Sequence, residues 1–239
     1  MKREITIITP TADREFCLKR LAYYIERQTF IGDIQWIISD SGSQSFSQIN
    51  ILHIYECIDY NYLGHIKKSH KSFCQNMQDA LSRVKYDKII VMEDDDWYHP
   101  TYIETMWERL HKKDLIGEIP ATYYHIKDQS YRILLNTERA SMCQMGFRSV
   151  VIPILKHILK QQDAFVDIKL WKYYSSKFRK QLYNSRLSIG IKGMPGNPGI
   201  GIGHRPKDVH RTKDKNFQKL EEWIGKEDTD FYRSIYSNV

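Results

Sequence analysis

Residues 88–100 have the sequence KIIVMEDDDWYHP, in which an apolar run leads directly into four carboxylates. The apolar part, Lys88–Met92, predicts a short buried strand, because isoleucine and valine favour strands. Glu93–Asp96 then follow at its carboxyl end. Like charges this close raise one another's pKa or recruit a cation, so the stretch predicts a site for Mg²⁺ or Mn²⁺, with an exposed acidic turn as the alternative.

Two earlier segments have the same arrangement of a strand that ends in polar residues. Glu4–Ile8 predicts a strand closed by Thr9, Pro10 and Thr11, and Ile34–Ser39 predicts a strand that ends in Asp40–Ser43. In a parallel sheet, ligands bind outside the carboxyl ends of the strands. We therefore expect the three polar strand ends to converge on one crevice.

Helices are predicted between these strands. Asp13 is expected to cap a helix that runs to about Gln28, and Ser69–Val84 places its apolar residues on one helical face. Alternating strands and helices predict an α/β fold with a mainly parallel sheet flanked by helices. The remaining predictions are a strand at Ile51–Tyr55, a β pair at Tyr123–His125 and Tyr131–Leu135, and helices at Pro153–Gln161, Ala164–Lys177 and Leu220–Ser237. Residues 188–204 hold six glycines and two prolines, which predicts a loop.

Composition favours a soluble globular protein. The chain has 239 residues, of which 41% are hydrophobic and 27% charged, enough for a hydrophobic core. No apolar run approaches the roughly 20 residues of a membrane span, and the first residues lack the apolar region of a secretory signal. The four cysteines are scattered without a CxxC pair, which is typical of reduced thiols and predicts a cytoplasmic location.

The basic residues are concentrated in the second half of the chain. The net charge is +7, and residues 151–219 hold 15 Lys and Arg against four Asp and Glu. Such an excess indicates either contact with a polyanion or a solvated basic surface.

Taken in order, ITIITPTADR, WIISDSGS and IIVMEDDDWYHP resemble the nucleotide-binding half of family-2-like glycosyltransferases with the GT-A fold. The resemblance covers about residues 4–110 clearly and 140–205 more loosely. It implies one integrated GT-A (Rossmann-like) domain. Residues 1–110 would bind the nucleotide sugar, and residues 111–239 would form the acceptor side with the Gly-rich loop 188–204 and a closing helix.

The resemblance also implies roles for individual residues. Asp95 matches the metal-binding Asp of an Asp-x-Asp-type motif, and Asp94 matches a residue that contacts the donor's ribose or sugar. The other expected donor contacts are Thr9, Thr11, Arg14 and Asp40, with Lys68 and Lys71 either near the nucleotide or solvated on a helix face. The family often has a second acid after the one matched by Asp40, whereas this chain has Ser41, which leaves uracil recognition by that acid open.

In the second half, the resemblance points to a base and to a loop histidine. Asp167, in FVDIKLW, matches the family's general base, with a helix-capping acid as the alternative role and Asp163 as the fallback base. His204 matches a histidine that completes the metal coordination, with His210 as its competitor. Arg205 or Lys192 would neutralise the leaving diphosphate.

The implied function is metal-dependent transfer of a sugar from a UDP-sugar, UDP-glucose first, to a hydroxyl acceptor with inversion. Two acceptors are open: a 5-hydroxymethylpyrimidine such as hydroxymethylcytosine in DNA, as for virus-encoded transferases of the host cytoplasm, or a cell-surface saccharide or lipid-linked glycan. The other classes considered are a sugar nucleotidyltransferase and a non-catalytic nucleic-acid-binding protein. The sequence leaves the oligomeric state open.

Overall fold

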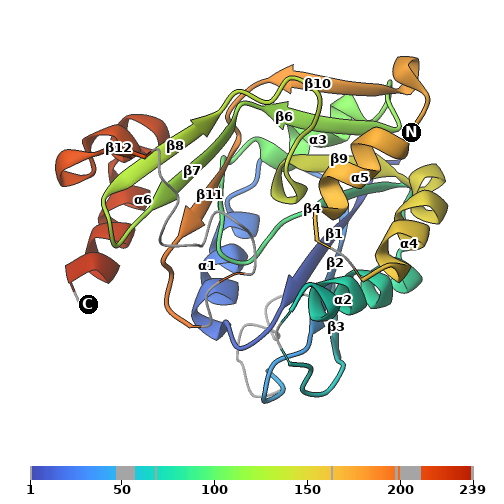
Figure 1. The fold of residues 1–239 in the computed structure, drawn as a ribbon, viewed down its shortest axis with the longest axis horizontal. Coiled ribbons are helices and arrows are strands. Elements are labelled where there is room, and N and C mark those ends of the chain that lie inside the picture. Colours follow the sequence, from blue (N-terminus) through green and yellow to red (C-terminus); the bar gives the residue numbers. More distant parts are fainter. Residues whose placement is uncertain are drawn as a thin grey trace.

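The computed structural model describes residues 2–46, 57–67, 69–162, 164–196, 199 and 211–237. Its centre is a seven-stranded sheet with the order β10-β6-β9-β4-β1-β2-β3 (Figure 1). The strands of this sheet are β1 (Glu4–Thr11), β2 (Asp33–Asp40), β3 (Ile58–Tyr62), β4 (Lys88–Val91), β6 (Leu115–Ile119), β9 (Met145–Arg148) and β10 (Lys180–Asn184). β1 to β4 are mutually parallel, and β9 runs antiparallel between β4 and β6. The predicted α/β fold with a mainly parallel sheet is confirmed.

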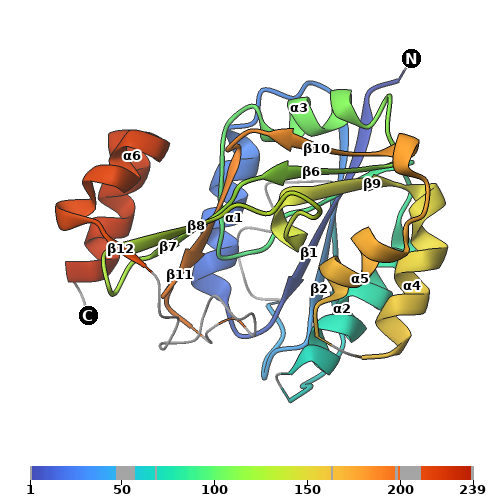
Figure 2. The same cartoon turned by 45° about the horizontal axis from the view of Figure 1, so that its top comes forward.

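Helices cover both faces of this sheet (Figures 1 and 2). They are α1 (Glu15–Glu26), α2 (His70–Arg83), α3 (Tyr102–Arg109), α4 (Ile152–Lys160) and α5 (Val166–Tyr173), whereas α6 (Gln218–Ser237) lies beside β12, β8 and β7 at the far end of the molecule. Side chains alternate along the central strands, so that Ile5 and Ile7 of β1 join a core with α1, α3 and α6, whereas Ile8 joins a core with α2, α4 and α5. A strand buried on both faces needs an almost continuous apolar run, which explains EITII and KIIVM.

A second, five-stranded sheet has the order β12-β8-β7-β11-β5. Its strands are β5 (Trp97–Tyr98), β7 (Ala121–His125), β8 (Ser130–Leu134), β11 (Ser188–Lys192) and β12 (Thr212–Lys213). β5 follows the acidic turn directly and pairs antiparallel with β11. This pairing brings a strand from late in the chain to the carboxyl end of β4.

The structure corrects the prediction that residues 188–204 are a loop throughout. Residues Ser188–Lys192 form the fully buried strand β11, which pairs with β5 and β7. Gly190 is needed there for close packing, because a Cβ would lie 2.5 Å from Cδ1 of Tyr123. The loop prediction holds for Gly193–Gly196, while most of the remaining segment lies outside the described residues.

Two further local predictions are wrong in detail. Asp13 does not cap α1, because Arg14 occupies the N-cap position and Asp13 accepts hydrogen bonds from the amide and hydroxyl of Ser43 instead. The third parallel strand is β3, Ile58–Tyr62, which the sequence pattern missed, and the predicted strand Ile51–Tyr55 lies outside the described residues. The predicted helices and the β7–β8 pair are present with shifted ends.

Candidate active site

The four carboxylates lie in the turn between β4 and β5, at the carboxyl end of the central strands. Asp94, Asp95 and Asp96 are each no more than 2% exposed, whereas Glu93 is half-buried. Removal from water raises the pKa of Glu93 to about 8 and that of Asp96 to about 6, and mutual repulsion adds to both shifts. The alternative of an exposed acidic turn is therefore excluded, and the buried charge requires cations.

Arg14 supplies one of these cations from the loop between β1 and α1. Its guanidinium donates through Nη1 to Asp94 and through Nη2 to Oδ2 of Asp95, the latter at 2.8 Å. The second oxygen of Asp94 accepts a hydrogen bond of 2.6 Å from the hydroxyl of Thr11. Three of the residues predicted from the first and fourth strands, Thr11, Arg14 and Asp94, are thus in direct contact.

Lys192, at the end of β11, supplies a second cation. Its side chain is 5% exposed, and Nζ lies 3.2 Å from Oδ1 of Asp96 and 4.0 Å from Oδ2 of Asp95. The amide of Ile191 also donates to Asp96 Oδ1, at 2.9 Å. Ion pairs with the acidic turn raise the pKa of Lys192 despite its burial, so it stays charged. Sequence reasoning placed Lys192 in a loop and missed its ion pairs with the acids, while its expected role of neutralising the leaving diphosphate stays a prediction.

The acidic turn also contains a possible metal-binding group. Ligand atoms of Glu93, Asp96 and Cys143 lie within 4.8 Å of one another. Cys143 belongs to the short helix η2 (Met142–Gln144), and burial raises the pKa of its thiol well above the usual value. Mg²⁺ and Mn²⁺ prefer oxygen ligands, and a protonated thiol is a poor ligand. The carboxylate oxygens of the turn therefore suit a hard divalent ion better than the thiol of Cys143 does.

The predicted metal pair Asp95 and His204 stays a prediction. Asp95 lies in the acidic turn, where its Oδ2 is shared by Arg14 and Lys192. His204 lies outside the described residues, as do Arg205, His210, Lys68 and Asp163.

The end of β2 lies beside this turn and presents Asp40. Its carboxylate is buried and accepts hydrogen bonds of 2.8 Å from the amide of Gly42 and from the hydroxyl of Tyr60. Burial raises the pKa of Asp40 to about 6, although these two bonds oppose the shift. Asn76 of α2 connects this strand end to β1, because its amide donates to Thr11 O and to Ser41 Oγ. The ends of β1, β2 and β4 therefore converge, as predicted.

Thr9 and Lys71 were both expected to contact the donor, and the structure places them differently: Thr9 is buried among the central strands and Lys71 is exposed. The hydroxyl of Thr9 is fully buried, donates to Met92 O and accepts from Nε1 of Trp36, each at 2.9 Å. It is therefore used in holding β1 against its neighbours. Lys71 is exposed on α2, which agrees with the alternative of a solvated lysine.

Asp167 lies in the first turn of α5 and is half-buried. Burial raises the pKa of its carboxyl, while the amide of Ile168 and the charge of Arg139 lower it. Phe165 occupies the N-cap position with a left-handed backbone, so Asp167 is not the N-cap residue. Arg139 is four residues ahead of Cys143, whose thiol lies beside Glu93 and Asp96 of the acidic turn. The role of Asp167 as a base stays a prediction.

Comparisons with known proteins agree with this geometry. The profile described as glycosyl transferase family 2 matches residues 6–184. Among solved structures, TarS 1-349 of S. aureus in complex with UDP has a TM-score of 0.59 at 12% identity, over 80% of this chain and 60% of that one. The complex of the same fragment with UDP-GlcNAc has a TM-score of 0.58 at 12% identity, over 81% of this chain and 59% of that one.

A mannosyltransferase from Pyrobaculum calidifontis in complex with GDP-Man and Mn²⁺ has a TM-score of 0.52 at 10% identity, over 82% of this chain and 58% of that one. No curated protein matches by sequence. The chain thus spans about 60% or less of the length of these solved proteins, and at such identities the likeness concerns the fold. The predicted GT-A fold is confirmed.

Proposed function

We propose, from the premise that the chain belongs to glycosyl transferase family 2, that it transfers a sugar from a nucleoside diphosphate sugar to a hydroxyl group. The observation that carries the proposal is the buried acidic turn at the end of β4, held by Arg14 and Lys192 beside the ends of β1 and β2. This is the edge at which an open α/β sheet binds its ligands. Acidic and basic groups together suit a diphosphate and its counter-ion.

We propose UDP as the nucleotide and glucose as the first sugar to test. UDP is supported by the TarS complexes, which hold UDP and UDP-GlcNAc. Asp40 and Thr11 would contact the nucleoside, and Asp94 would contact the ribose or sugar. A divalent ion bound by Asp95 and its neighbours would stabilise the charge that develops on the leaving diphosphate. The mannosyltransferase complex with Mn²⁺ supports this choice of ion.

Asp167 and Arg14 would have different roles in the transfer. Asp167 takes the proton of the acceptor hydroxyl. The acceptor oxygen forms a bond to the anomeric carbon of the sugar, and the bond between this carbon and the diphosphate oxygen breaks. Arg14 is placed to hold Asp94 and Asp95 in position during this displacement. Single displacement inverts the anomeric centre.

Donor use is tested by incubating the protein with UDP-glucose, UDP-GlcNAc and GDP-mannose, with and without Mn²⁺, and measuring release of the nucleoside diphosphate. We expect release from a UDP-sugar that depends on Mn²⁺ and is lost in Asp95→Asn. Glu108→Gln, which changes an exposed carboxylate on α3, is the matched control and should keep the activity. Equal release by Asp95→Asn and the control would contradict the assignment.

The two acceptors predicted from the sequence are separated in the same assay. DNA duplexes with hydroxymethylcytosine, hydroxymethyluracil or ordinary bases are compared with saccharide and lipid-linked glycan acceptors, and products are identified by mass spectrometry. The basic excess of residues 151–219 supports a polyanionic acceptor. A sugar adduct on one hydroxymethylated base would identify DNA, and an adduct on a glycan alone would identify the saccharide.

A further inference from the structure

Four exposed apolar side chains lie on or beside η3 (Ser149–Val151), α4, α5 and the short helix η4 (Lys177–Arg179), and none of them has a part in the proposed chemistry, although α5 also carries Asp167. Phe178 is 89% exposed, Val150 58%, Tyr173 54% and Phe165 48%. Single apolar residues scattered over a surface are ordinary, but four of the nine large apolar residues exposed in the described part of the chain fall within one short stretch, residues 150–178.

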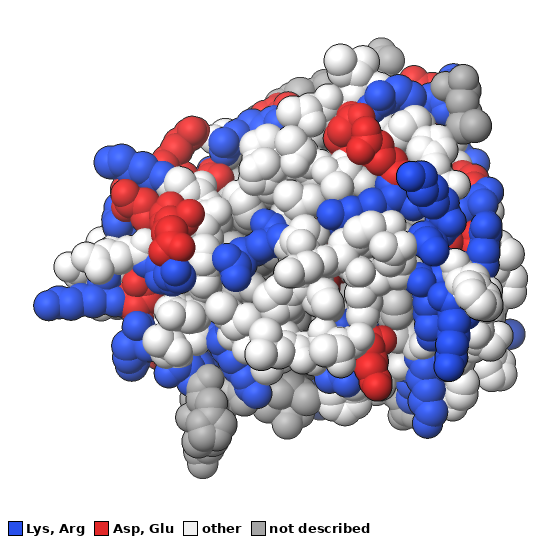
Figure 3. All heavy atoms as spheres, turned by 90° about the horizontal axis from the view of Figure 1, so that it is seen from above, with Lys and Arg blue, Asp and Glu red and all other residues white. Residues whose placement is uncertain are grey.

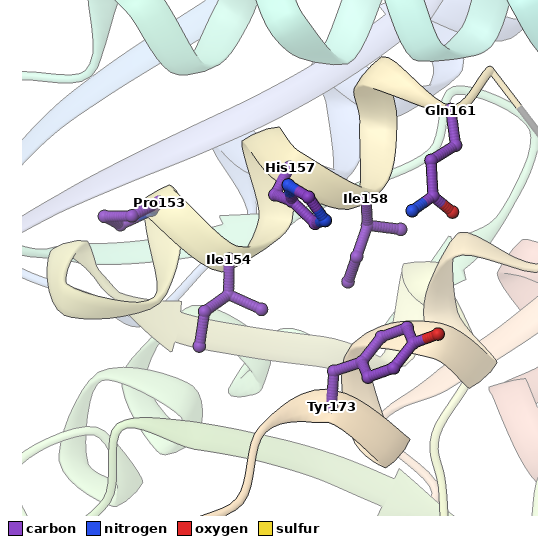
Figure 4. Close-up of a pocket in the computed structure, with 6 residues that line it drawn as sticks. All are labelled: Pro153, Ile154, His157, Ile158, Gln161 and Tyr173. Atoms are coloured by element: carbon purple, nitrogen blue, oxygen red, sulfur yellow. The ribbon is translucent and has the colours of Figure 1, made fainter.

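The same stretch forms a shallow hollow of about 450 Å³ between α4 and α5. Its lining is mainly apolar, and Figure 4 shows Ile154 and Ile158 of α4 pointing toward the ring of Tyr173 of α5. Lys180 ties η4 to the end of α5, because its Nζ donates to the carbonyl groups of Trp171 and Tyr174. The helices that carry the exposed rings of Tyr173 and Phe178 are thus joined by hydrogen bonds through Lys180.

Basic side chains accompany this apolar surface. Lys160, Lys172 and Lys177 are exposed at the ends of α4, α5 and η4, and Figure 3 shows Lys and Arg gathered on the side of the molecule that carries these helices. The nearby carboxylate of Asp114 is already bonded to Arg179 and Tyr174. The surface is therefore cationic as well as apolar. We name it the α4–α5 face: Val150, Ile154, Lys160, Phe165, Lys172, Tyr173, Lys177 and Phe178.

We propose that the α4–α5 face docks on the surface of an anionic lipid bilayer. Aromatic rings and aliphatic groups enter the interfacial region of a bilayer, while lysines contact the headgroups. Val150 and Ile154 favour this partner over a nucleic acid, because a duplex offers phosphates to lysines but no apolar phase for aliphatic side chains. The inference does not depend on the glycosyl transfer proposed above.

The test is flotation of the full chain with vesicles of phosphatidylcholine alone and with vesicles that contain equal amounts of phosphatidylcholine and phosphatidylglycerol. We expect binding to the anionic vesicles that weakens with salt, and little binding to the neutral ones. Lys172→Glu and Lys177→Glu should each weaken binding by about fivefold or more, the equivalent of about 1 kcal/mol per charge near the surface. Phe178→Ser should also weaken it.

Matched controls change residues of the same kind elsewhere. Ile31→Ser alters an 84% exposed apolar residue ahead of β2, and Lys215→Glu alters an exposed lysine beside α6. Both should bind vesicles as the parent chain does, and thermal melting should show that all variants remain folded. The proposal is overturned if the parent chain does not bind anionic vesicles, or if face and control variants bind equally. It is also overturned if the face variants lose binding to duplex DNA while their vesicle binding is unchanged.

Discussion

The ammonium group of Lys192 lies 3.2 Å from Oδ1 of Asp96, and both side chains are buried. One residue belongs to β11 of the second sheet, and the other follows β4 of the first. An ion pair removed from water contributes little net stability when intact, but removing one partner leaves a buried charge without compensation. The acidic turn therefore depends on a cation carried by a distant strand.

Replacing Lys192 should expose this dependence. Lys192→Met is expected to lower the free energy of unfolding by about 3 kcal/mol, because Asp95 and Asp96 lose a neighbouring positive charge. Mn²⁺ should then recover more stability in the variant than in the parent chain, since the ion replaces the lost charge. Denaturant titrations with and without Mn²⁺ measure both effects. Lys215→Met, at an exposed position, is the control, and equal losses in the two variants would contradict the role of Lys192.

Asp40 should make stability depend on pH. Its folded pKa of about 6 is higher than the ordinary value of 3.8, so its contribution is most favourable below pH 3.8 and is lost as the pH rises through 6. Between pH 5 and pH 8 this loss is about 1 kcal/mol. Asp40→Asn removes the charge, so the stability of the variant relative to the parent chain should improve by that amount over the same range. An unchanged difference at the two pH values would show that Asp40 ionises normally.

Asp167→Asn should separate donor binding from transfer. The amide cannot take the acceptor's proton, so transfer should fall by about 10²–10⁴-fold, while the affinity for the nucleotide sugar stays within a small factor. Isothermal titration with the donor and a product assay give the two quantities. Transfer at the parent rate would move the role of base to another group, and retention of the anomeric configuration would exclude single displacement.

Asp228 should matter for stability although it belongs to α6, more than 130 residues after the acidic turn in the chain. Its Oδ1 accepts hydrogen bonds from Arg20 at 2.6 Å and from Arg27 at 2.9 Å, and its Oδ2 accepts one from Trp97 Nε1 at 2.7 Å. Asp228→Ala leaves two arginines and a buried indole without their acceptor, so the free energy of unfolding should fall by about 3 kcal/mol. Asp230→Ala changes a neighbour on α6 whose ion pairs with Lys226 and Arg233 lie at the surface, and it should cost much less stability in the same denaturant titration.

The central strands were predictable because burial on both faces leaves a plain signature. Burial on both faces explains the almost continuous apolar character of EITII, IQWIIS and KIIVM. The polar residues that follow each run lie together at the carboxyl edge of the sheet. The strand at Ser188–Lys192 was missed because the six glycines of residues 188–204 predicted a loop, whereas Gly190 is required there by the close approach of the Tyr123 ring. The alternation of Ile189 and Ile191 was the available signal.

The partners of the carboxylates could not be predicted for a different reason. Arg14 and Lys192 are 80 or more residues away in the chain from the acids that they contact. A local sequence pattern does not show which basic residue will pair with which acidic residue. The hydrogen-bond partner of Asp13 could not be predicted either, although it lies only 30 residues away in the chain. A helix cap was the natural prediction, but its carboxylate bonds to Ser43 in the turn after β2.

The pairing of β11 with β5 also sets the order in which the molecule can be completed. The family profile ends at residue 184, before the strand that carries Lys192 has begun. A chain leaving the ribosome would therefore hold all four acids of the turn well before the lysine that neutralises them. Until β11 docks, Arg14 can already pair with Asp94 and Asp95, while Asp96 lacks the ammonium group of Lys192 and the amide of Ile191 that it contacts in the complete structure.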